Sequence, residues 1–154
     1  MSKDFRKLKV WQRSHQLVLD LYRITILFPR TESYELTTQI RRAGVSIPSN
    51  IAEGCGRSSD TELARFCDIA GGSASELEYQ LLLTRDLKLM QPDDYEQLVQ
   101  QTTEIKRMLT VFVRRLRAHG RFMPVSQLQT AECPSNQSIT PSRSRFRRLP
   151  HNRD

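Results

Sequence analysis

The sequence predicts an all-α protein: an up-down-up-down antiparallel four-helix bundle with a kinked second helix and a disordered C-terminal tail. Two observations support this fold class. Apolar residues recur at spacings of three, four and seven along four long segments, as on one face of a helix, and no segment alternates as a strand does. Short connections containing Pro, Gly and Ser separate these segments, so consecutive helices run antiparallel. We assign residues 1–120 to the bundle and residues 121–154 to the tail.

The first helix begins between Asp4 and Lys9 and ends at Phe28. Pro29 follows, and the residue before a proline is disfavoured in the helical conformation. The core stripe of this helix consists of Val10, Leu17, Leu21, Ile24 and Phe28.

The second helix begins at Ser33 or Tyr34 and contains an unusual stretch, QIRRAGVSIPSNIAEGCGR, over residues 39–57. Pro48 lies in the middle of its periodic pattern. Proline lacks the N–H that would bond the carbonyl of Gly44, and its ring crowds that turn. We therefore expect a kink between Gly44 and Pro48, or alternatively two shorter helices broken there. Gly54 and Gly56 would end the helix, the usual place for a left-handed glycine.

Two faces of this helix are suited to burial. One is an apolar stripe of Leu36, Ile40, Ala43, Ile47 and Ile51. A second face, formed by Arg41, Val45, Pro48 and Ala52, lies roughly opposite. A surface helix needs only one apolar face, so the second indicates another helix or another subunit as its partner.

Capping signals delimit the last two helices. Ser59 and Glu62 form an S-x-x-E capping box before a third helix over residues 60–87. Gly71 and Gly72 lie in its middle, where each glycine costs up to about 1 kcal/mol, which predicts close approach of another backbone. Pro92 starts the fourth helix, which ends near His119.

The chain is basic, with a net charge of +7, and the excess is uneven. Residues 1–120 hold 18 basic and 15 acidic residues, a net of +3, whereas residues 121–154 hold 6 and 2, a net of +4. A basic balance favours partners with phosphate or acidic surfaces. The run RSRFRR, residues 143–148, could hold RNA or DNA, although a solvated extension explains the tail more simply.

The three cysteines form no CxxC pair, which argues for a reducing compartment. The N-terminus has no apolar run, and no window approaches the length of a membrane span. We therefore expect a cytoplasmic protein that does not contact a membrane.

Polar residues follow the second helix beside its apolar stripe: Gln39, Arg42, Ser46, Asn50, Glu53 and Arg57. Glu53, together with Glu76 and Glu78 of the third helix, could pair with Arg41, Arg42 or Arg57, and buried pairs would fix helix register. We expect Asn50 and Glu53 to be structural. The arginines could instead point outward as phosphate ligands, with Arg114, Arg115 and Arg117 of the fourth helix as further candidates.

The residues Leu8–Gln12, Phe28-Pro29, Arg41–Gly54, Gly56-Arg57 and Gly72-Ser73 carry a resemblance to a known family. The chain resembles the bacterial four-helix-bundle family associated with intervening sequences of ribosomal RNA genes, over about residues 5–118. Glu35 departs from the pattern, which often has glycine there, and the tail has no counterpart. The resemblance implies a homopentamer without established catalytic activity. It also extends, more distantly, to a pentameric accessory protein that is implicated in binding nucleic acid and a reverse transcriptase.

No pattern for catalysis or metal binding is present. None of the histidines lies three residues after a glutamate, as di-iron bundles require, and Cys55 and Cys67 lack zinc-ligand spacing. Gly54–Ser59 could bind an anion at a helix N-terminus, although a capped turn explains it more simply. We therefore predict a non-enzymatic, self-assembling bundle without cofactors that binds RNA or DNA through a basic surface. The alternative is an oligomeric scaffold for a protein partner, such as a reverse transcriptase.

Overall fold

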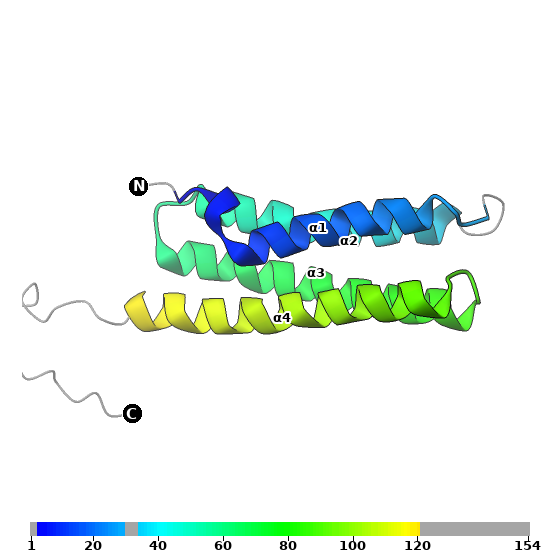
Figure 1. Ribbon diagram of the computed structural model, residues 1–154. Coiled ribbons are helices and arrows are strands. Elements are labelled where there is room, and N and C mark those ends of the chain that lie inside the picture. The colour runs from blue at the N-terminus through cyan, green and yellow to red at the C-terminus, as the bar shows by residue number, and fades with distance from the viewer. Residues whose placement is uncertain (1–2, 30–33, 121–154) are drawn as a thin grey trace, which may run out of the picture. The chain divides into compact units, whose positions relative to one another are not determined.

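The computed structural model describes residues 3–29 and 34–120 and contains four long helices (Figure 1). A single 3₁₀ turn, η1 (Phe5–Lys7), precedes α1 (Lys9–Thr25), α2 (Tyr34–Cys55), α3 (Asp60–Asp86) and α4 (Pro92–Gly120). The predicted tail, residues 121–154, lies outside the described residues.

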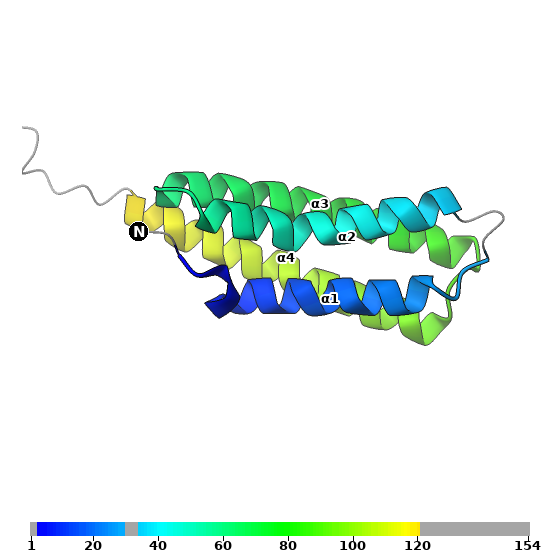
Figure 2. The ribbon, with the colours of Figure 1, turned by 90° about the horizontal axis from the view of Figure 1, so that it is seen from above.

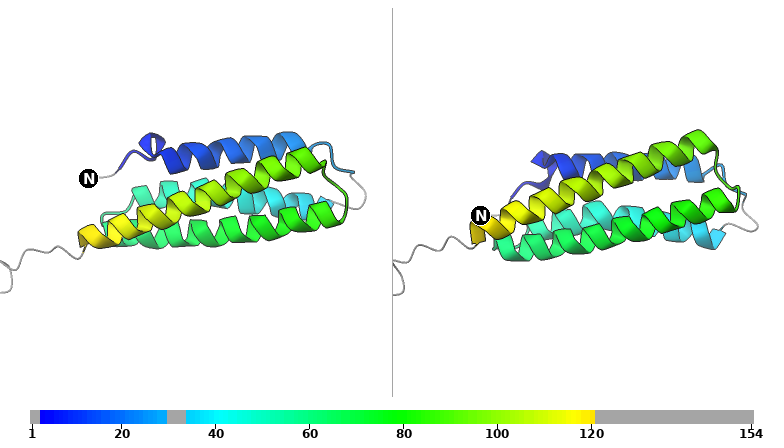
Figure 3. Two further views of the ribbon diagram at one scale, coloured as in Figure 1. Left: turned by 60° about the horizontal axis from the view of Figure 1, so that its bottom comes forward. Right: turned by 90° about the horizontal axis from the view of Figure 1, so that it is seen from below.

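The helices form an antiparallel bundle in which each packs against two others. Helix α1 contacts α2 and α4, and α3 contacts the same two helices, so α1 and α3 occupy opposite corners. Figures 2 and 3 show that the start of α1, the α2–α3 turn and the end of α4 lie at the same end of the bundle. The predicted fold class and the up-down-up-down order are confirmed.

The predicted apolar stripes make the core. Because these positions recur with helical periodicity, all of them face the bundle axis at once. The fully buried aliphatic side chains come from all four helices: Leu17, Leu21, Ile40, Ile47, Ile51, Leu63, Leu77, Leu81, Leu98 and Ile105. Hydroxyls that enter this core are satisfied locally, since Ser14 Oγ donates to the Val10 carbonyl at 2.7 Å and Thr102 Oγ1 to the Leu98 carbonyl at 2.7 Å.

One predicted helix end differs from the structure, and one predicted cap is confirmed. Helix α1 ends at Thr25, three residues before the expected Phe28, and turn bonds from Leu27 N to Ile24 O and from Phe28 N to Thr25 O follow it. Phe28 is nevertheless buried, so the apolar pattern continued past the helix. At the start of α3, the Ser59 hydroxyl accepts a bond of 3.2 Å from Glu62 N, which confirms the predicted cap.

Helix α2 continues without interruption through Pro48, so the alternative of two shorter helices is wrong. Pro48 is buried, and it lines a small cavity with Trp11 and Val18 of α1. Part of the second face of α2 therefore packs within the same chain, while Val45 remains 38% exposed. The kink itself stays a prediction.

The glycines correct two further expectations. Gly54 lies inside α2, and no described glycine has a positive φ, so the expected left-handed stop is wrong. A Cβ on Gly54 would lie 2.8 Å from Phe66 Cβ, which shows that its absence lets α3 approach. By contrast, no described atom lies within 4 Å of a Cβ placed on Gly71 or Gly72, so the close backbone contact expected there does not occur within the chain.

Candidate nucleic-acid interface

The polar row of α2 lies partly along the seam with α3. Ser46 Oγ and Ser73 Oγ are 2.9 Å apart, and Asn50 Nδ2 donates to the Ser46 carbonyl at 2.8 Å and to Ser46 Oγ at 3.0 Å. These three side chains are half-buried, whereas Gln39 is exposed. This small network connects α2 to α3, the structural arrangement that was expected for Asn50.

One of the possible pairs between carboxylates and arginines forms, and it is exposed rather than buried. Glu53 pairs with Arg57 along α2, but both side chains are exposed, and a surface pair of this kind contributes little. Glu78 pairs instead with Lys106 at 2.6 Å, and Glu76 accepts a bond of 3.0 Å from Gln80 Nε2. Glu76 and Glu78 therefore have partners other than the three candidate arginines.

The arginines of α2 differ in their surroundings. Arg41 Nε donates to Thr25 Oγ1 at 2.9 Å, and its guanidinium lies 4.7 Å from the centre of the Tyr22 ring, so it links α1 to α2. Arg42 is exposed and makes no hydrogen bond or ion pair with the described residues. The guanidinium of Arg57 also lies over the Phe66 ring, at 4.9 Å.

The arginines of α4 point to the surface near its C-terminal end. Arg117 pairs with Asp68 of α3, and both side chains are about half exposed. Arg114 and Arg115 are exposed, and Arg114 makes no hydrogen bond or ion pair with the described residues. These side chains present positive charge to solvent at the end of the bundle that also holds the start of α1 (Figure 3).

Charge divides sharply between the two ends of the bundle. The midpoints of the helices separate a positive half (residues 3–17, 45–73 and 106–120) from a negative half (residues 18–29, 34–44 and 74–105). The positive half holds twelve basic and five acidic residues, a net of +7, and the negative half five basic and nine acidic, a net of −4. Two ion pairs, Lys106–Glu78 and Arg13–Glu104, cross the boundary, and without them the halves keep +5 and −2.

A groove between α3 and α4 lies in the positive half and has a volume of about 360 Å³. Its lining contains three cations, Lys106, Arg114 and Arg117, and one carboxylate, Asp68. The hydroxyls of Ser75 and Thr110 also lie there. We call it the α3–α4 groove. Its combination of cations and hydroxyls matches the groups that contact phosphate and sugar in nucleic-acid complexes.

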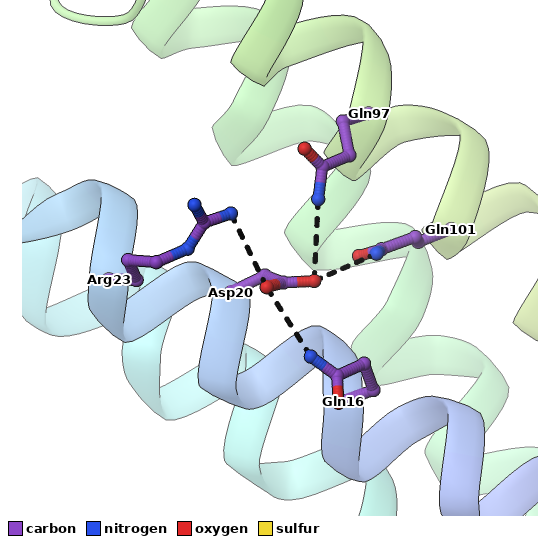
Figure 4. Close-up of polar contacts among 5 residues, drawn as sticks. All are labelled: Gln16, Asp20, Arg23, Gln97 and Gln101. Carbon is purple, nitrogen blue, oxygen red and sulfur yellow. Dashed lines mark hydrogen bonds and ion pairs between the residues drawn. The ribbon is translucent and has the colours of Figure 1, made fainter.

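A polar cluster that the sequence patterns did not reveal lies between α1 and α4 in the negative half (Figure 4). Asp20 is only 8% exposed, and one of its carboxylate oxygens accepts from Gln101 Nε2 at 2.9 Å and from Gln97 Nε2 at 3.4 Å. Its other oxygen lies 3.4 Å from Gln16 Nε2 and 3.5 Å from Arg23 Nη2. One sequence signal was available, because position 20 falls on the apolar stripe of α1, where a carboxylate must find partners.

Neither described cysteine is arranged for chemistry. Burial raises the pKa of the Cys67 thiol to about 12, and burial also raises the pKa of Cys55. A raised pKa keeps both sulfurs protonated and unreactive near neutral pH. No group of His, Cys, Asp and Glu among the described residues could hold a metal ion, and no described helix is long and apolar enough to cross a membrane.

The sequence profile of the 23S rRNA-intervening sequence protein family matches residues 6–111, more than half of the chain. The chain belongs to this family. The resemblance drawn from residues 5–118 is therefore confirmed.

Among solved structures, the chain is similar to a protein of unknown function from the S23 ribosomal protein family of Bacteroides thetaiotaomicron. The two share 26% identity with a TM-score of 0.63, over 68% of this chain and 98% of the other. No curated protein matches the sequence significantly.

Proposed function

We propose that this protein is a non-enzymatic, self-assembling helical bundle that binds RNA or DNA through its positive half. The observation that carries the proposal is the separation of charge, with +7 in one half of the bundle and −4 in the other. A concentrated positive surface attracts the phosphate backbone and releases its counterions, which is the main source of sequence-tolerant affinity.

Basic side chains of the positive half are available to bind a nucleic acid. Lys7, Lys9, Arg65, Arg107 and Arg114 are all exposed and make no ion pair with the described residues. The α3–α4 groove adds Lys106 and Arg117, whose carboxylate partners already hold them at its rim. Of the candidate arginines, this proposal assigns phosphate contacts to Arg57, Arg114, Arg115 and Arg117, and it leaves Arg41 and Arg42 outside the contact surface.

The names of the family and of the similar structure refer to 23S rRNA and to a ribosomal protein family. They support an RNA partner by association only, because a name carries no geometry. The two described cysteines are buried, and an absence of CxxC pairs fits a cytoplasmic setting, where thiols stay reduced.

The proposal is tested by the mobility of labelled single-stranded RNA and duplex DNA with the full-length protein. At about 50 mM salt we expect binding to both, and at about 200 mM salt we expect an affinity lower by about 10³-fold or more, since several phosphates are neutralised. Absence of retardation of either nucleic acid at the lower salt would overturn the proposal.

For assembly we propose a homopentamer, with the number five taken from the family resemblance. A ring of five needs two different patches on each subunit, because its contacts are heterologous. Exposed apolar residues occur at two opposite corners. Ile26 is 73% exposed near Tyr22 and Tyr34 on the α1–α2 side, and Ile69 and Tyr79 are 45% and 64% exposed on α3.

Light scattering tests this assembly. The wild-type chain should have the mass of a pentamer, and Ile26→Glu and Tyr79→Glu should each give monomers. An equal mixture of the two variants should give a dimer, because one intact patch of each kind remains. A monomeric mass for the wild-type chain at micromolar concentration would contradict the assembly.

A second candidate function, that of a scaffold for a protein partner, is favoured by one observation. An apolar groove with a basic rim lies between α1 and α4, on the other side of α4 from the α3–α4 groove. The family profile and the similar structure of unknown function do not distinguish the two candidates.

A further inference from the structure

We propose that the groove between the start of α1 and the C-terminal half of α4 binds an acidic amphipathic helix of a partner protein. This α1–α4 groove has a volume of about 420 Å³. It is lined by Leu8, Lys9, Val10, Arg107, Met108, Val111, Phe112 and Arg115.

The floor of the groove is apolar and open to solvent. Val10 is buried beneath it, Leu8, Met108 and Phe112 are half-buried, and Val111 is 47% exposed. On α4, positions 108, 111, 112 and 115 lie on one side of the helix because they are three and four residues apart. An occupant with an apolar stripe of the same helical spacing would cover this floor, as amphipathic helices do in other grooves.

The rim fixes the charge of that occupant. Lys9, Arg107 and Arg115 border the groove, and its lining contains no acidic residue. Lys9 and Arg107 are exposed and make no ion pair with the described residues. Glu104, the acidic residue nearest to Arg107 in the sequence, already pairs with Arg13 at 3.6 Å. Carboxylates on the partner would therefore complement the cations of Lys9 and Arg107 beside an apolar floor.

Two other occupants fit less well. A nucleic-acid backbone could reach the rim, but the apolar floor offers it no hydrogen-bond donors, unlike the hydroxyl-containing α3–α4 groove. The tail of this chain carries six basic and two acidic residues, so its charge has the wrong sign. An acidic amphipathic helix satisfies both the floor and the rim.

Fluorescence anisotropy with three labelled synthetic peptides of about five helical turns tests the inference. The first has Leu at helical spacing and Glu elsewhere, the second has the same Leu pattern with Lys, and the third is a scrambled form of the first. The wild-type protein should bind the first peptide at least about tenfold more tightly than the other two, a difference of about 1.4 kcal/mol. Equal binding of all three, or no binding of the first, would overturn the proposal.

Variants locate the binding site. Val111→Glu should weaken binding of the acidic peptide by about tenfold or more, since it places a carboxylate on the exposed floor. Leu87→Glu is the matched control, because Leu87 is 55% exposed at the far end of the bundle, and it should leave peptide binding unchanged. Circular dichroism shows whether both variants keep the wild-type helical content. Folded Val111→Glu that binds the peptide as wild type does would place the peptide elsewhere and contradict the proposal.

The same variants distinguish the other occupants. If Val111→Glu lowers the oligomeric mass in light scattering, the groove is an interface between copies of this chain, and the inference is wrong. If it weakens RNA or DNA binding as strongly as peptide binding, the groove belongs to the nucleic-acid surface, and the inference is again wrong. Unchanged mass and unchanged nucleic-acid affinity, with lost peptide affinity, support a separate protein site. Failure here would leave the nucleic-acid proposal intact, since that proposal rests on the net charge of the whole positive half and not on an occupant of this groove.

Discussion

The positive and negative halves of the bundle use charged residues in different ways. In the negative half, Asp20 is buried between α1 and α4, where four side chains surround its carboxylate. In the positive half, Arg107 and Arg114 face solvent without an ion pair among the described residues. The difference indicates that a buried carboxylate holds helices together in the negative half, while arginine side chains in the positive half remain available for a partner.

Asp20→Ala should give the largest loss of stability among charge-removing substitutions. The change removes the acceptor of Gln97 and Gln101 in a largely buried position, so we expect a decrease of about 1–3 kcal/mol in the free energy of unfolding. Urea denaturation of the full-length protein measures it. Glu96→Ala, at an exposed position of α4 beside Gln97, is the control and should stay within about 0.5 kcal/mol of wild type. Equal changes in the free energy of unfolding of the two variants would contradict a structural role for Asp20.

Replacing Gly54 and Gly72 by alanine should change the free energy of unfolding in opposite directions, measured in the same way. Gly54→Ala places a methyl group 2.8 Å from Phe66 Cβ, and we expect a loss of about 1–3 kcal/mol from overpacking. Gly72→Ala meets open space and should stabilise the isolated bundle by up to about 1 kcal/mol through helix propensity. If Gly72→Ala instead lowers the oligomeric mass in light scattering, another copy packs against α3 at this position.

Removing exposed arginine side chains of the positive half should leave the free energy of unfolding nearly unchanged. Arg107→Ala and Arg114→Ala each remove an exposed side chain without an ion pair among the described residues, so each should stay within about 0.5 kcal/mol of wild type in urea. A loss of 1 kcal/mol or more, on the order expected for a buried contact, would show that these arginines are structural. That result would weaken the contrast between the two halves.

The effect of Cys67 appears only at alkaline pH and is absent near neutral pH. Because burial raises the pKa of Cys67 from 9.0 to about 12, the unfolded chain loses this proton at a lower pH than the folded chain does. Cys67 therefore contributes stability that is complete below pH 9 and is lost as the pH rises toward 12. Alkylation by iodoacetamide at pH 8 should be slow in the native protein and rapid in urea. Rapid alkylation of native Cys67 would show that the α3 seam opens readily.

Periodicity in the sequence was sufficient for the fold but not for the details of the site. The apolar stripes predicted four helices because one repeating pattern fixes the buried face of each. Gly54 was interpreted as a helix end because glycine serves both caps and close packing, and only the position of Phe66 decides between them. The pairing of Glu53 with Arg57 lay within the local pattern, whereas Glu78 pairs with Lys106 of α4, a helix that the local pattern did not bring near.

The separation of charge between the two halves could have been predicted from the sequence once the four helices were assigned, but the sequence patterns alone did not point to it. Lys9 and Arg115 are far apart in the chain and lie beside the same groove only because α1 and α4 are antiparallel. A sum of the charges in each half of the predicted bundle would have placed the candidate arginines of α4 at one end. It would have placed Arg41 and Arg42 of α2 at the other end. The Asp20 cluster was harder, because Gln97 and Gln101 meet it across 77 and 81 residues.

The affinity of two double variants for one labelled single-stranded RNA at about 50 mM salt tests the central claim most directly. Arg107→Glu with Arg114→Glu changes the positive half, and Arg42→Glu with Lys88→Glu makes the same change of charge at exposed positions of the negative half. We predict that the first pair weakens RNA binding by about tenfold or more, while the second stays within about threefold of wild type. Equal losses in both variants would show that total charge alone governs binding, and would contradict the assignment of the interface to the positive half.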